Sequence, residues 1–343
     1  MKVAVYHNNK DVRIEERPMP KIGPGELLIK VMASGICGSD VMEWYRLKKA
    51  PCVLGHETSG EVVEAGRGVA RFKKGDRVVF THHVPCNDCR YCKRGFQTLC
   101  DTLRATNFDP GGFSQFVRLP AINVERGTLA LPDSVSFEEA TFVEPLGCVV
   151  RGFRLARFEP GLSVLVLGSG MAGILTIALA KSLGAGRIVA TDISPFRLEL
   201  AKKFGADAVL PASDVTQKLV GVNNGSPAEF VVVCAGAPAV FSQALKCADR
   251  GAAILYFAPA EPGQEIPLPI FDFWHNGTTL TSSYGASIED LTQALDLIRE
   301  KRVPVAQMIS HRLDLEEAPL GFKLVAEAKE SLKVILEPHR ASN

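Results

Sequence analysis

The sequence predicts an α/β protein in which a small antiparallel β-barrel is followed by a doubly wound parallel sheet. Two observations support this fold class. Short strand-like segments separated by turn residues fill the first 120 residues, and apolar strands alternate with helices from Ser163 onward. The chain has 343 residues, of which 46% are hydrophobic and 22% are charged, which is enough for one large or two medium domains with buried cores.

The N-terminal part has the spacing of β-hairpins. Turn residues such as Asn8, Asn9 and the GPGE sequence at residues 23–26 separate short runs of β-forming residues. The predicted strands cover residues 3–6, 12–16, 27–34, 60–66, 75–80 and 113–119. An antiparallel barrel is the simplest architecture for strands that are this short and this closely spaced.

Helix signals appear after residue 120. Ser136 followed by Glu139 forms a capping box, and Pro145 opens a second helix, because proline is tolerated in a first helical turn. Glu144 is thereby held at a helix start. Beyond Ser163 the predicted strands are VLVLG, RIVATD, and residues 208–210, 229–236 and 252–258. Apolar strands with helices between them indicate a parallel sheet that is covered on both faces.

We expect three segments along the chain. Residues 1–150 form the barrel domain and include a cysteine-rich loop at residues 86–100, and residues 151–286 form a dinucleotide-binding domain. Residues 287–343 are expected to pack back on the barrel domain. Ser287 with Asp290 caps the helix that begins this last segment.

The charge balance argues against nucleic acid or an anionic membrane as a partner. Lys and Arg number 39 against 38 Asp and Glu, which gives a net charge of +1, and the sequence has no basic tract. The first residues turn polar quickly, and no apolar run reaches the roughly 18 residues that cross a bilayer. Four of the nine cysteines lie close together, as metal ligands do, so we expect a reducing, cytoplasmic setting.

A glycine-rich turn joins the VLVL strand to the next helix. Its residues are Gly168, Ser169, Gly170, Met171, Ala172 and Gly173. This G-x-G-x-x-G pattern lets the backbone approach a pyrophosphate at a helix N-terminus, and a packing turn that binds nothing is the alternative. Asp192 ends the following strand, where a carboxylate can bind the adenosine ribose and repel a 2′-phosphate, so NAD is predicted rather than NADP. Arg197 either reaches that ribose or lies in solvent on the next helix.

Four cysteines lie within fifteen residues, at Cys86, Cys89, Cys92 and Cys100. Four thiolates fill a tetrahedral zinc and leave no open position, so this site is predicted to be structural. A disulfide pair or an iron–sulfur cluster is the alternative. A nucleic-acid-binding zinc ribbon is disfavoured because basic and aromatic residues do not extend beyond the loop.

A second metal site is indicated by Cys37 and His56, which lie nineteen positions apart, each in a glycine-flanked turn. Thiolate and imidazole both suit zinc, and a third ligand with one open position makes such a site catalytic. Asp40 can accept a hydrogen bond from the distal nitrogen of His56, and Ser39 offers a hydroxyl near the open position. Taken alone, either ligand is more often an ordinary buried residue.

Five motifs in order, GICGSD, GHE, CxxCxxCx7C, VEPLG and VLVLGSGMAG, resemble those of the zinc-containing medium-chain alcohol dehydrogenase superfamily over nearly the whole chain. The EPLG context of Glu144 is most similar to the sorbitol (polyol) and threonine dehydrogenase branch. The resemblance implies a GroES-like barrel domain and a Rossmann nucleotide domain. It also implies a catalytic zinc held by Cys37, His56 and Glu144, with Glu57 binding or approaching the metal from behind and Ser39 taking the substrate proton.

The resemblance implies two zinc ions per chain, one catalytic and one structural, and a homo-oligomer, either a dimer or a tetramer. Cys148 lies one helical turn after Glu144 and is a rival third ligand. The other free cysteines, Cys52, Cys234 and Cys247, are interpreted as small core residues.

Three positions depart from the family pattern. Met42 stands where many members have a histidine that completes the proton path, and a methionine carries no proton. Glu43 stands where sorbitol dehydrogenases tend to have a tyrosine, and Ser283-Tyr284 stands where they have an arginine and a tyrosine near the substrate. The side chains expected in the substrate pocket are Glu43, Trp44, Phe108 and Tyr284.

The predicted function is the zinc-dependent transfer of a hydride from a secondary alcohol, such as a polyol, cyclitol or amino alcohol, to NAD, which gives a ketone or aldehyde. The alternative is a non-catalytic protein in which zinc and dinucleotide only stabilise the fold. A ligand set with an open position, together with Ser39, favours the enzyme.

Overall fold

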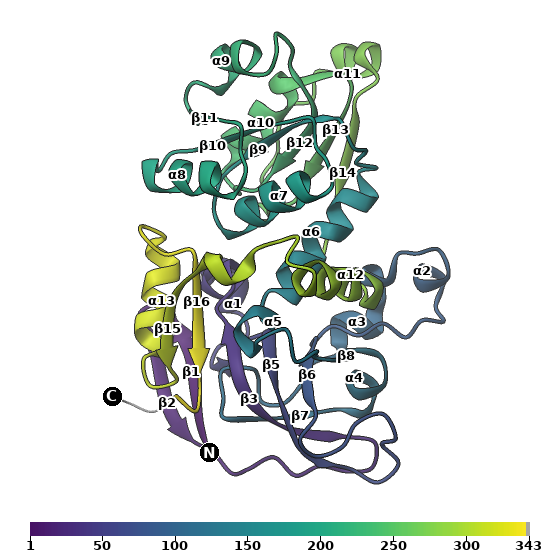
Figure 1. Ribbon diagram of the computed structural model, residues 1–343, viewed down its shortest axis with the longest axis vertical. Helices are drawn as coiled ribbons and strands as arrows, with labels where there is room; N and C mark the ends of the chain where they lie inside the picture. The colour runs from purple at the N-terminus through teal and green to yellow at the C-terminus, as the bar shows by residue number, and fades with distance from the viewer. Residues whose placement is uncertain (341–343) are drawn as a thin grey trace. The chain divides into compact units, whose positions relative to one another are not determined.

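The computed structural model describes residues 1–340 and divides into two compact units (Figure 1). Unit 1 contains Met1–Gly147 together with the chain from Gly285 onward, and unit 2 contains Cys148–Tyr284. Helix α6 (Val143–Leu155) contains the first boundary between them. Each unit has its own sheet and its own buried core.

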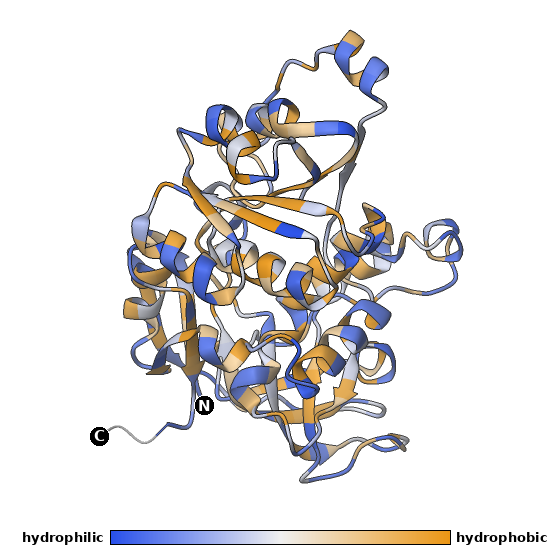
Figure 2. Ribbon diagram, turned by 45° about the horizontal axis from the view of Figure 1, so that its top comes forward, coloured by the Kyte–Doolittle hydropathy of each residue, from blue (hydrophilic) through white to orange (hydrophobic). Residues whose placement is uncertain are grey.

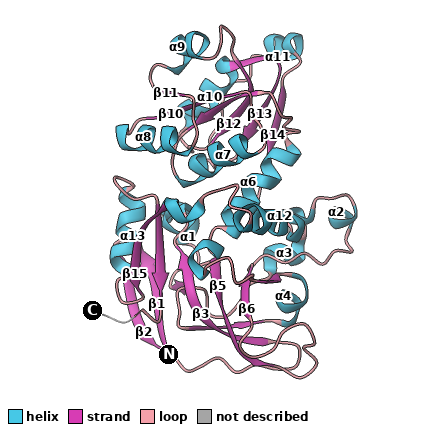
Figure 3. Ribbon diagram, viewed as in Figure 1, coloured by secondary structure: helices cyan, strands magenta, loops and turns pink. Residues whose placement is uncertain are grey.

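Unit 1 is built on two β-sheets (Figure 3). The larger has seven strands in the order β15-β16-β3-β5-β6-β8, with β7 also paired to β3. These strands are β3 (Leu27–Gly35), β5 (Glu57–Ala65), β6 (Arg77–Phe80), β7 (Phe116–Leu119), β8 (Thr128–Ala130), β15 (Ile309–Asp314) and β16 (Lys333–Glu337). The smaller sheet has the order β2-β1-β4 and consists of β1 (Lys2–Asn8), β2 (Asp11–Glu16) and β4 (Cys52–Val53). Both strand pairs of the smaller sheet are antiparallel. In the larger sheet, β15 and β16 pair in parallel and all other pairs are antiparallel.

Short helices fill the connections of unit 1. They are η1 (Gly38–Val41), α1 (Glu43–Arg46), α2 (Arg90–Lys93), η2 (Gln97–Leu99), α3 (Asp101–Ala105), α4 (Ala121–Arg126), α5 (Phe137–Ala140), α12 (Ile288–Arg299), η3 (Val305–Met308) and α13 (Ala318–Glu327). Both predicted capping boxes are present, Ser136 with Glu139 at α5 and Ser287 with Asp290 at α12. Each satisfies two backbone N–H groups that a helix start leaves unpaired.

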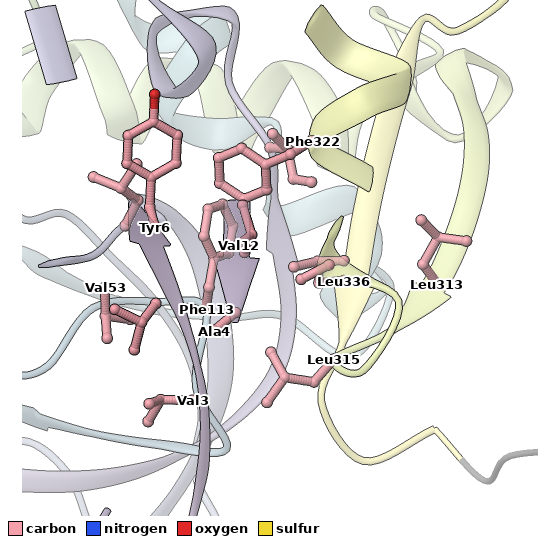
Figure 4. Packing of buried hydrophobic residues seen from close by; sticks show 14 of the residues in the cluster. Val3, Ala4, Tyr6, Val12, Val53, Phe113, Leu313, Leu315, Phe322 and Leu336 are labelled. Carbon is pink, nitrogen blue, oxygen red and sulfur yellow. The ribbon is translucent and has the colours of Figure 1, made fainter. Parts of the chain in front are cut away.

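The two ends of the chain share one hydrophobic core in unit 1 (Figure 4). The Phe322 ring of α13 lies 5.4 Å from the ring of Tyr6 in β1 and 5.6 Å from that of Phe113. All three side chains are almost completely buried. Because alternate residues of a strand share a face, β1 turns Tyr6 toward the helix that the C-terminal segment supplies.

Unit 2 is a six-stranded parallel sheet in the order β11-β10-β9-β12-β13-β14. Its strands are β9 (Ser163–Leu167), β10 (Arg187–Asp192), β11 (Ala208–Pro211), β12 (Ala228–Val233), β13 (Ala248–Tyr256) and β14 (Thr279–Ser282). Its further helices are α7 (Met171–Ser182), α8 (Pro195–Phe204), α9 (Val215–Val222), α10 (Pro238–Cys247) and α11 (Ile270–Asn276). The central strands are predominantly hydrophobic (Figure 2), as strands covered on both faces must be.

The predicted fold class is confirmed, and the differences are local. Strand β5 begins at Glu57, three residues before the predicted start, so Glu57 belongs to the sheet. Helix α6 begins at Val143, which puts Pro145 in its first turn. Edge strand β14 and helix α11 were not predicted, because TLTS is a four-residue strand with weak alternation and IFDFWHN is a helix of only seven residues. In residues 1–340, no helix is long and apolar enough to span a membrane.

Candidate active site

Strand register brings the two glycine-flanked turns together. Gly35, the last residue of β3, pairs with Glu57, the first residue of β5. Cys37 therefore leaves the sheet at the point where His56 enters it. Ligand atoms of Cys37, His56 and Glu57 all lie within 4.8 Å of one another, so a thiolate, an imidazole and a carboxylate converge on one point. This donor set fits a zinc ion.

The turn after β3 is held by its own side chains. Cys37 caps η1, where its Sγ accepts from the Ser39 N–H at 3.4 Å and its own N–H donates to Asp40 Oδ2 at 3.1 Å. Asp40 is fully buried, and its Oδ1 lies 3.4 Å from His56 Nδ1. Asp40 therefore lies beside His56, where the sequence predicted a carboxylate partner for the imidazole. Burial alone lowers the pKa of His56, but Asp40 and Cys37 outweigh it and hold that pKa well above its usual value.

Glu57 forms a buried ion pair with Lys333, the first residue of β16. Both side chains are 1% exposed. Burial raises the pKa of Glu57, Glu144 raises it further, and Lys333 and His56 oppose that shift. A Cβ atom on Gly35 would lie 2.5 Å from Glu57 Oε2 and 2.6 Å from Lys333 Cε, so only glycine leaves room for the pair.

Glu144 lies next to the cluster but outside it. It occupies the first turn of α6 and lines a small hollow in unit 1 with Thr58, Thr81 and Leu291. Its charge reaches Glu57, as the raised pKa of that carboxyl indicates. Among the described residues, neither Glu144 nor Cys148 belongs to the group whose ligand atoms converge.

Arg46 contacts the site and was not predicted from the sequence. It ends α1, its side chain is 12% exposed, and it donates to Ser39 and Asp40. The sequence shows an arginine seven residues after Ser39. Its contact with Ser39 could not be predicted, because it depends on the two short helices, η1 and α1, that connect the two residues. Lys333 carried no usable signal, because it lies 276 residues from its partner Glu57.

Two further histidines lie beside the cluster. The His82 ring is 5.0 Å from the ring of His56 and 3.6 Å from that of His83. Burial lowers the pKa of His82 well below its usual value and lowers the pKa of His83 to about 3. Both imidazoles are therefore neutral at physiological pH and add no positive charge that would repel a metal ion.

The four clustered cysteines of the loop converge as the sequence predicted. The Sγ atoms of Cys86 and Cys100 are 3.6 Å apart, those of Cys89 and Cys92 are 3.6 Å apart, and those of Cys86 and Cys92 are 4.0 Å apart. A zinc tetrahedron with Zn–S bonds of about 2.3 Å has sulfur–sulfur edges of about 3.8 Å. Backbone N–H groups of Asp88 and Cys89 also point at Cys86 Sγ, which stabilises a thiolate. The site fits a structural zinc.

The expected substrate-pocket residues have different environments. Phe108 is 2% exposed and packs edge to face on Phe80, so it belongs to the core of unit 1. This excludes Phe108 from an open pocket. Glu43 is exposed and accepts a hydrogen bond from the Asn9 N–H, and Tyr284 is 45% exposed. Trp44 is half-buried beside Tyr45.

The glycine-rich turn of unit 2 has the geometry that a pyrophosphate needs. Gly168 has φ +99°, and a Cβ on Gly173 would lie 1.9 Å from the Gly168 carbonyl oxygen. The Ser169 N–H donates to Asp192 Oδ2 at 2.8 Å, which ties the turn to the end of β10. Arg197 Nη1 lies 3.9 Å from the same Oδ2, so this arginine faces the turn. Met171 and Ala172 open α7.

The remaining cysteines are core residues. Burial raises the pKa of Cys234 to about 12 and that of Cys247 to about 11, and it also raises the pKa of Cys52. A buried thiol with a raised pKa is a poor nucleophile. Among the described residues, none of these three cysteines belongs to a group whose ligand atoms converge. No disulfide joins any of the nine cysteines, all of which lie within the described residues.

Comparison with known proteins gives two family matches. The alcohol dehydrogenase GroES-like domain matches residues 23–132, and the zinc-binding dehydrogenase domain matches residues 172–300. Sorbitol dehydrogenase of Bacillus subtilis is 32% identical over 99% of this chain and 98% of that protein. L-threonine 3-dehydrogenase of Bacillus licheniformis is 32% identical over 94% of both chains.

Solved structures with similar folds hold both nicotinamide dinucleotides. A protein of Sinorhizobium meliloti 1021 described as a zinc-binding dehydrogenase, bound to NADP, has a TM-score of 0.88 at 27% identity and covers 98% of this chain and 99% of its own. A protein of E. coli CFT073 described as a short chain alcohol dehydrogenase, complexed with NADH, has a TM-score of 0.88 at 25% identity with the same coverage.

Replacing Lys333 with methionine should leave the Glu57 carboxylate buried without its partner. We expect a loss of about 3–5 kcal/mol in the free energy of unfolding, measured by urea denaturation. Lys2→Met is the control, because it removes an exposed ion pair with Glu316 and should change stability little. The double variant with Glu57→Gln should recover much of the loss. A double variant as unstable as the single one would contradict this account of the pair.

Proposed function

Because the chain belongs to the zinc-containing medium-chain alcohol dehydrogenase superfamily, in its sorbitol and threonine dehydrogenase-like branch, we propose that it transfers a hydride from a secondary alcohol to NAD. The product is a ketone or aldehyde. The observation that carries this proposal is the convergence of Cys37, His56 and Glu57 within 4.8 Å. Ser39 lies in the same turn, with its hydroxyl held by a hydrogen bond.

We assign the catalytic zinc to Cys37, His56 and Glu144. Glu57 is already paired with Lys333, so it is less available than Glu144 as a full ligand and serves as the carboxylate behind the metal. Asp40 holds the imidazole of His56 in orientation. We assign a second, structural zinc to the four loop cysteines, Cys86, Cys89, Cys92 and Cys100.

The residues of unit 1 divide the work of the reaction. Zinc, when bound, lowers the pKa of a coordinated hydroxyl, as it does for water. Ser39 accepts the substrate proton, and a bound dinucleotide would supply the hydride acceptor. Met42 takes no part in proton transfer, because a thioether has no exchangeable proton.

We propose NAD as the preferred dinucleotide, held by Gly168, Gly170 and Gly173 with Asp192 on the adenosine ribose. The Asp192 side chain is 5% exposed and already accepts hydrogen bonds from the backbone of Ser169 and Ser194. Each carboxylate oxygen keeps a second lone pair for a ribose hydroxyl. A 2′-phosphate would meet that negative charge, and Arg197 at 3.9 Å offsets it only in part.

We propose a polyol, cyclitol or amino alcohol as substrate. Support comes from relatives named for sorbitol and threonine, while Glu43 and Ser283 depart from the sorbitol dehydrogenase pattern. We also propose a cytoplasmic, reducing setting, supported by the absence of disulfides among the described cysteines. A non-catalytic zinc- and dinucleotide-binding protein is the other candidate. The Ser39 hydroxyl is held by a hydrogen bond, and a non-catalytic binding protein would not need it in a fixed position. This observation favours the enzyme.

We propose a homo-oligomer that forms through unit 2. Ile270, Phe271 and Trp274 on α11 are 67%, 68% and 72% exposed. Helix α11 is followed directly by β14, the edge strand of the parallel sheet. An exposed apolar face beside an open strand edge is typical of a self-association surface.

Screening alcohols, polyols, cyclitols and amino alcohols by NADH absorbance should reveal at least one substrate, and chelation of zinc should abolish its turnover. Cys37→Ala should lower turnover roughly a thousandfold, because the zinc contributes several kcal/mol to the reaction. Zinc content should fall from two ions to one, with the thermal midpoint little changed. Cys247→Ala, a core cysteine, is the matched control. Undiminished turnover in Cys37→Ala would rule out the metal assignment.

Asp192→Asn should weaken NAD binding about tenfold, because a charged hydrogen bond to the ribose becomes a neutral one. The ratio of kcat/KM for NADP to that for NAD should rise. Glu199→Gln, on the exposed face of α8, is the control and should change neither value. An unchanged cofactor preference in Asp192→Asn would mean that other groups hold the ribose.

The double variant Phe271→Asp/Trp274→Asp should have a lower mass in solution than the unchanged protein, because two charges replace the apolar face. Light scattering after size-exclusion chromatography measures this mass. Leu320→Asp, another exposed apolar residue, is the control and should leave the mass unchanged. If the double variant keeps the parental mass, the oligomer forms through another surface or does not form.

A further inference from the structure

We propose that Arg46 is a positioning residue of the reaction, because its guanidinium holds the Ser39 hydroxyl and the Asp40 carboxylate in one hydrogen-bonded group. The proposal rests on the proposed function and extends it. It assigns the aiming of the proton-accepting hydroxyl to a side chain outside the zinc ligands.

Three hydrogen bonds define the position of Arg46. Its Nε donates to the Ser39 carbonyl oxygen at 2.9 Å, and its Nη2 donates to Ser39 Oγ at 2.9 Å and to Asp40 Oδ1 at 3.1 Å. The side chain is 12% exposed, so these bonds are largely shielded from water. A planar guanidinium with two donors on one residue fixes both its backbone and its side chain.

Asp40 passes the effect of Arg46 to the metal-binding histidine. The same Oδ1 that accepts from Arg46 lies 3.4 Å from His56 Nδ1, and Oδ2 accepts from the Cys37 N–H. One arginine therefore orients the hydroxyl and balances the charge of the carboxylate that orients His56. These two tasks distinguish Arg46 from a residue that only closes a turn.

The chemistry of the proton step follows from the hydrogen-bond capacity of Ser39. A hydroxyl has one hydrogen and two lone pairs, and Arg46 occupies one lone pair. As the substrate O–H bond breaks, its electron pair stays on the substrate oxygen and its proton bonds to Ser39 Oγ, while the original Ser39 hydrogen passes to water. No electrons are exchanged in this step. The guanidinium keeps its own protons, because its pKa lies above 12.

The positive charge of Arg46 affects which proton transfer at Ser39 is favoured. A cationic donor on Oγ stabilises negative charge there, so Ser39 gives up its own hydrogen more readily once the substrate proton begins to arrive. Met42 cannot receive that hydrogen. The fixed cation therefore favours onward release to water without acting as a relay.

The test compares Arg46→Met and Arg46→Lys with Lys49→Met. Lys49 is an exposed cation three residues further on, near the Tyr45 ring. In Arg46→Met we expect kcat to fall about a hundredfold through misplacement of the hydroxyl, with KM changed less than threefold. The solvent isotope effect on kcat should increase, and zinc should stay at two ions per chain. The kcat of Arg46→Lys should lie between that of Arg46→Met and that of the parent. The kcat of Lys49→Met should match that of the parent.

Added guanidinium ion should restore part of the kcat of Arg46→Met. In the absence of substrate, the same ion should raise the thermal midpoint of Arg46→Met more than it raises that of the parent. The proposal is overturned if kcat per bound zinc is unchanged, or if the loss follows zinc content or unfolding in both Arg46 variants. Failure of the proposed function is separate, because the parental protein would then reduce NAD with none of the alcohols.

Discussion

The close approach of three strands at Gly35 is the constraint on which the turns carrying Cys37 and His56 depend. Gly35 of β3 pairs with Glu57 of β5 on one side and with Ile335 of β16 on the other. Glu57 and Lys333 occupy the space that a side chain at Gly35 would need. The buried ion pair therefore joins a strand from the start of the chain to one from its end, and the turn that carries Cys37 leaves the sheet at this junction.

Charge around the cluster is unevenly distributed, and that imbalance suits a divalent cation. The thiol of Cys37 and the carboxyls of Asp40 and Glu57 lie close together in a buried region, and Glu144 is near enough to raise the pKa of Glu57. Within the same region, Arg46 pairs with Asp40 and Lys333 pairs with Glu57. Each balances one carboxylate. The raised pKa of His56 indicates that its imidazole holds a proton beside the Cys37 sulfur, and a bound divalent ion would take the place of that proton.

The sequence predicted the parts of the site that local chemistry determines. Cysteine spacing indicated the loop whose four sulfurs converge, G-x-G-x-x-G indicated the turn at Gly168, and the neighbouring position of Asp40 indicated its contact with His56. It could not predict Lys333, because a buried ion pair across 276 residues depends on strand order. Phe108 was misplaced for a similar reason, since only the barrel register shows that its side chain meets Phe80. Local patterns specify ligand chemistry, whereas tertiary register specifies which charges are compensated.

In the proposed mechanism, Arg46 separates two parts of the site: the residues that would hold the metal and the path by which the substrate proton leaves. The ligand turns are fixed by the sheet at Gly35, which does not involve the residue at position 42. Met42 ends η1 with a backbone hydrogen bond to Ser39, so its side chain is free to differ without moving the serine. Orientation of the Ser39 hydroxyl then passes to an arginine four residues further along, which contributes charge but no transferable proton. Water must complete the path, so the rate of the proton step depends on the solvent that reaches Ser39.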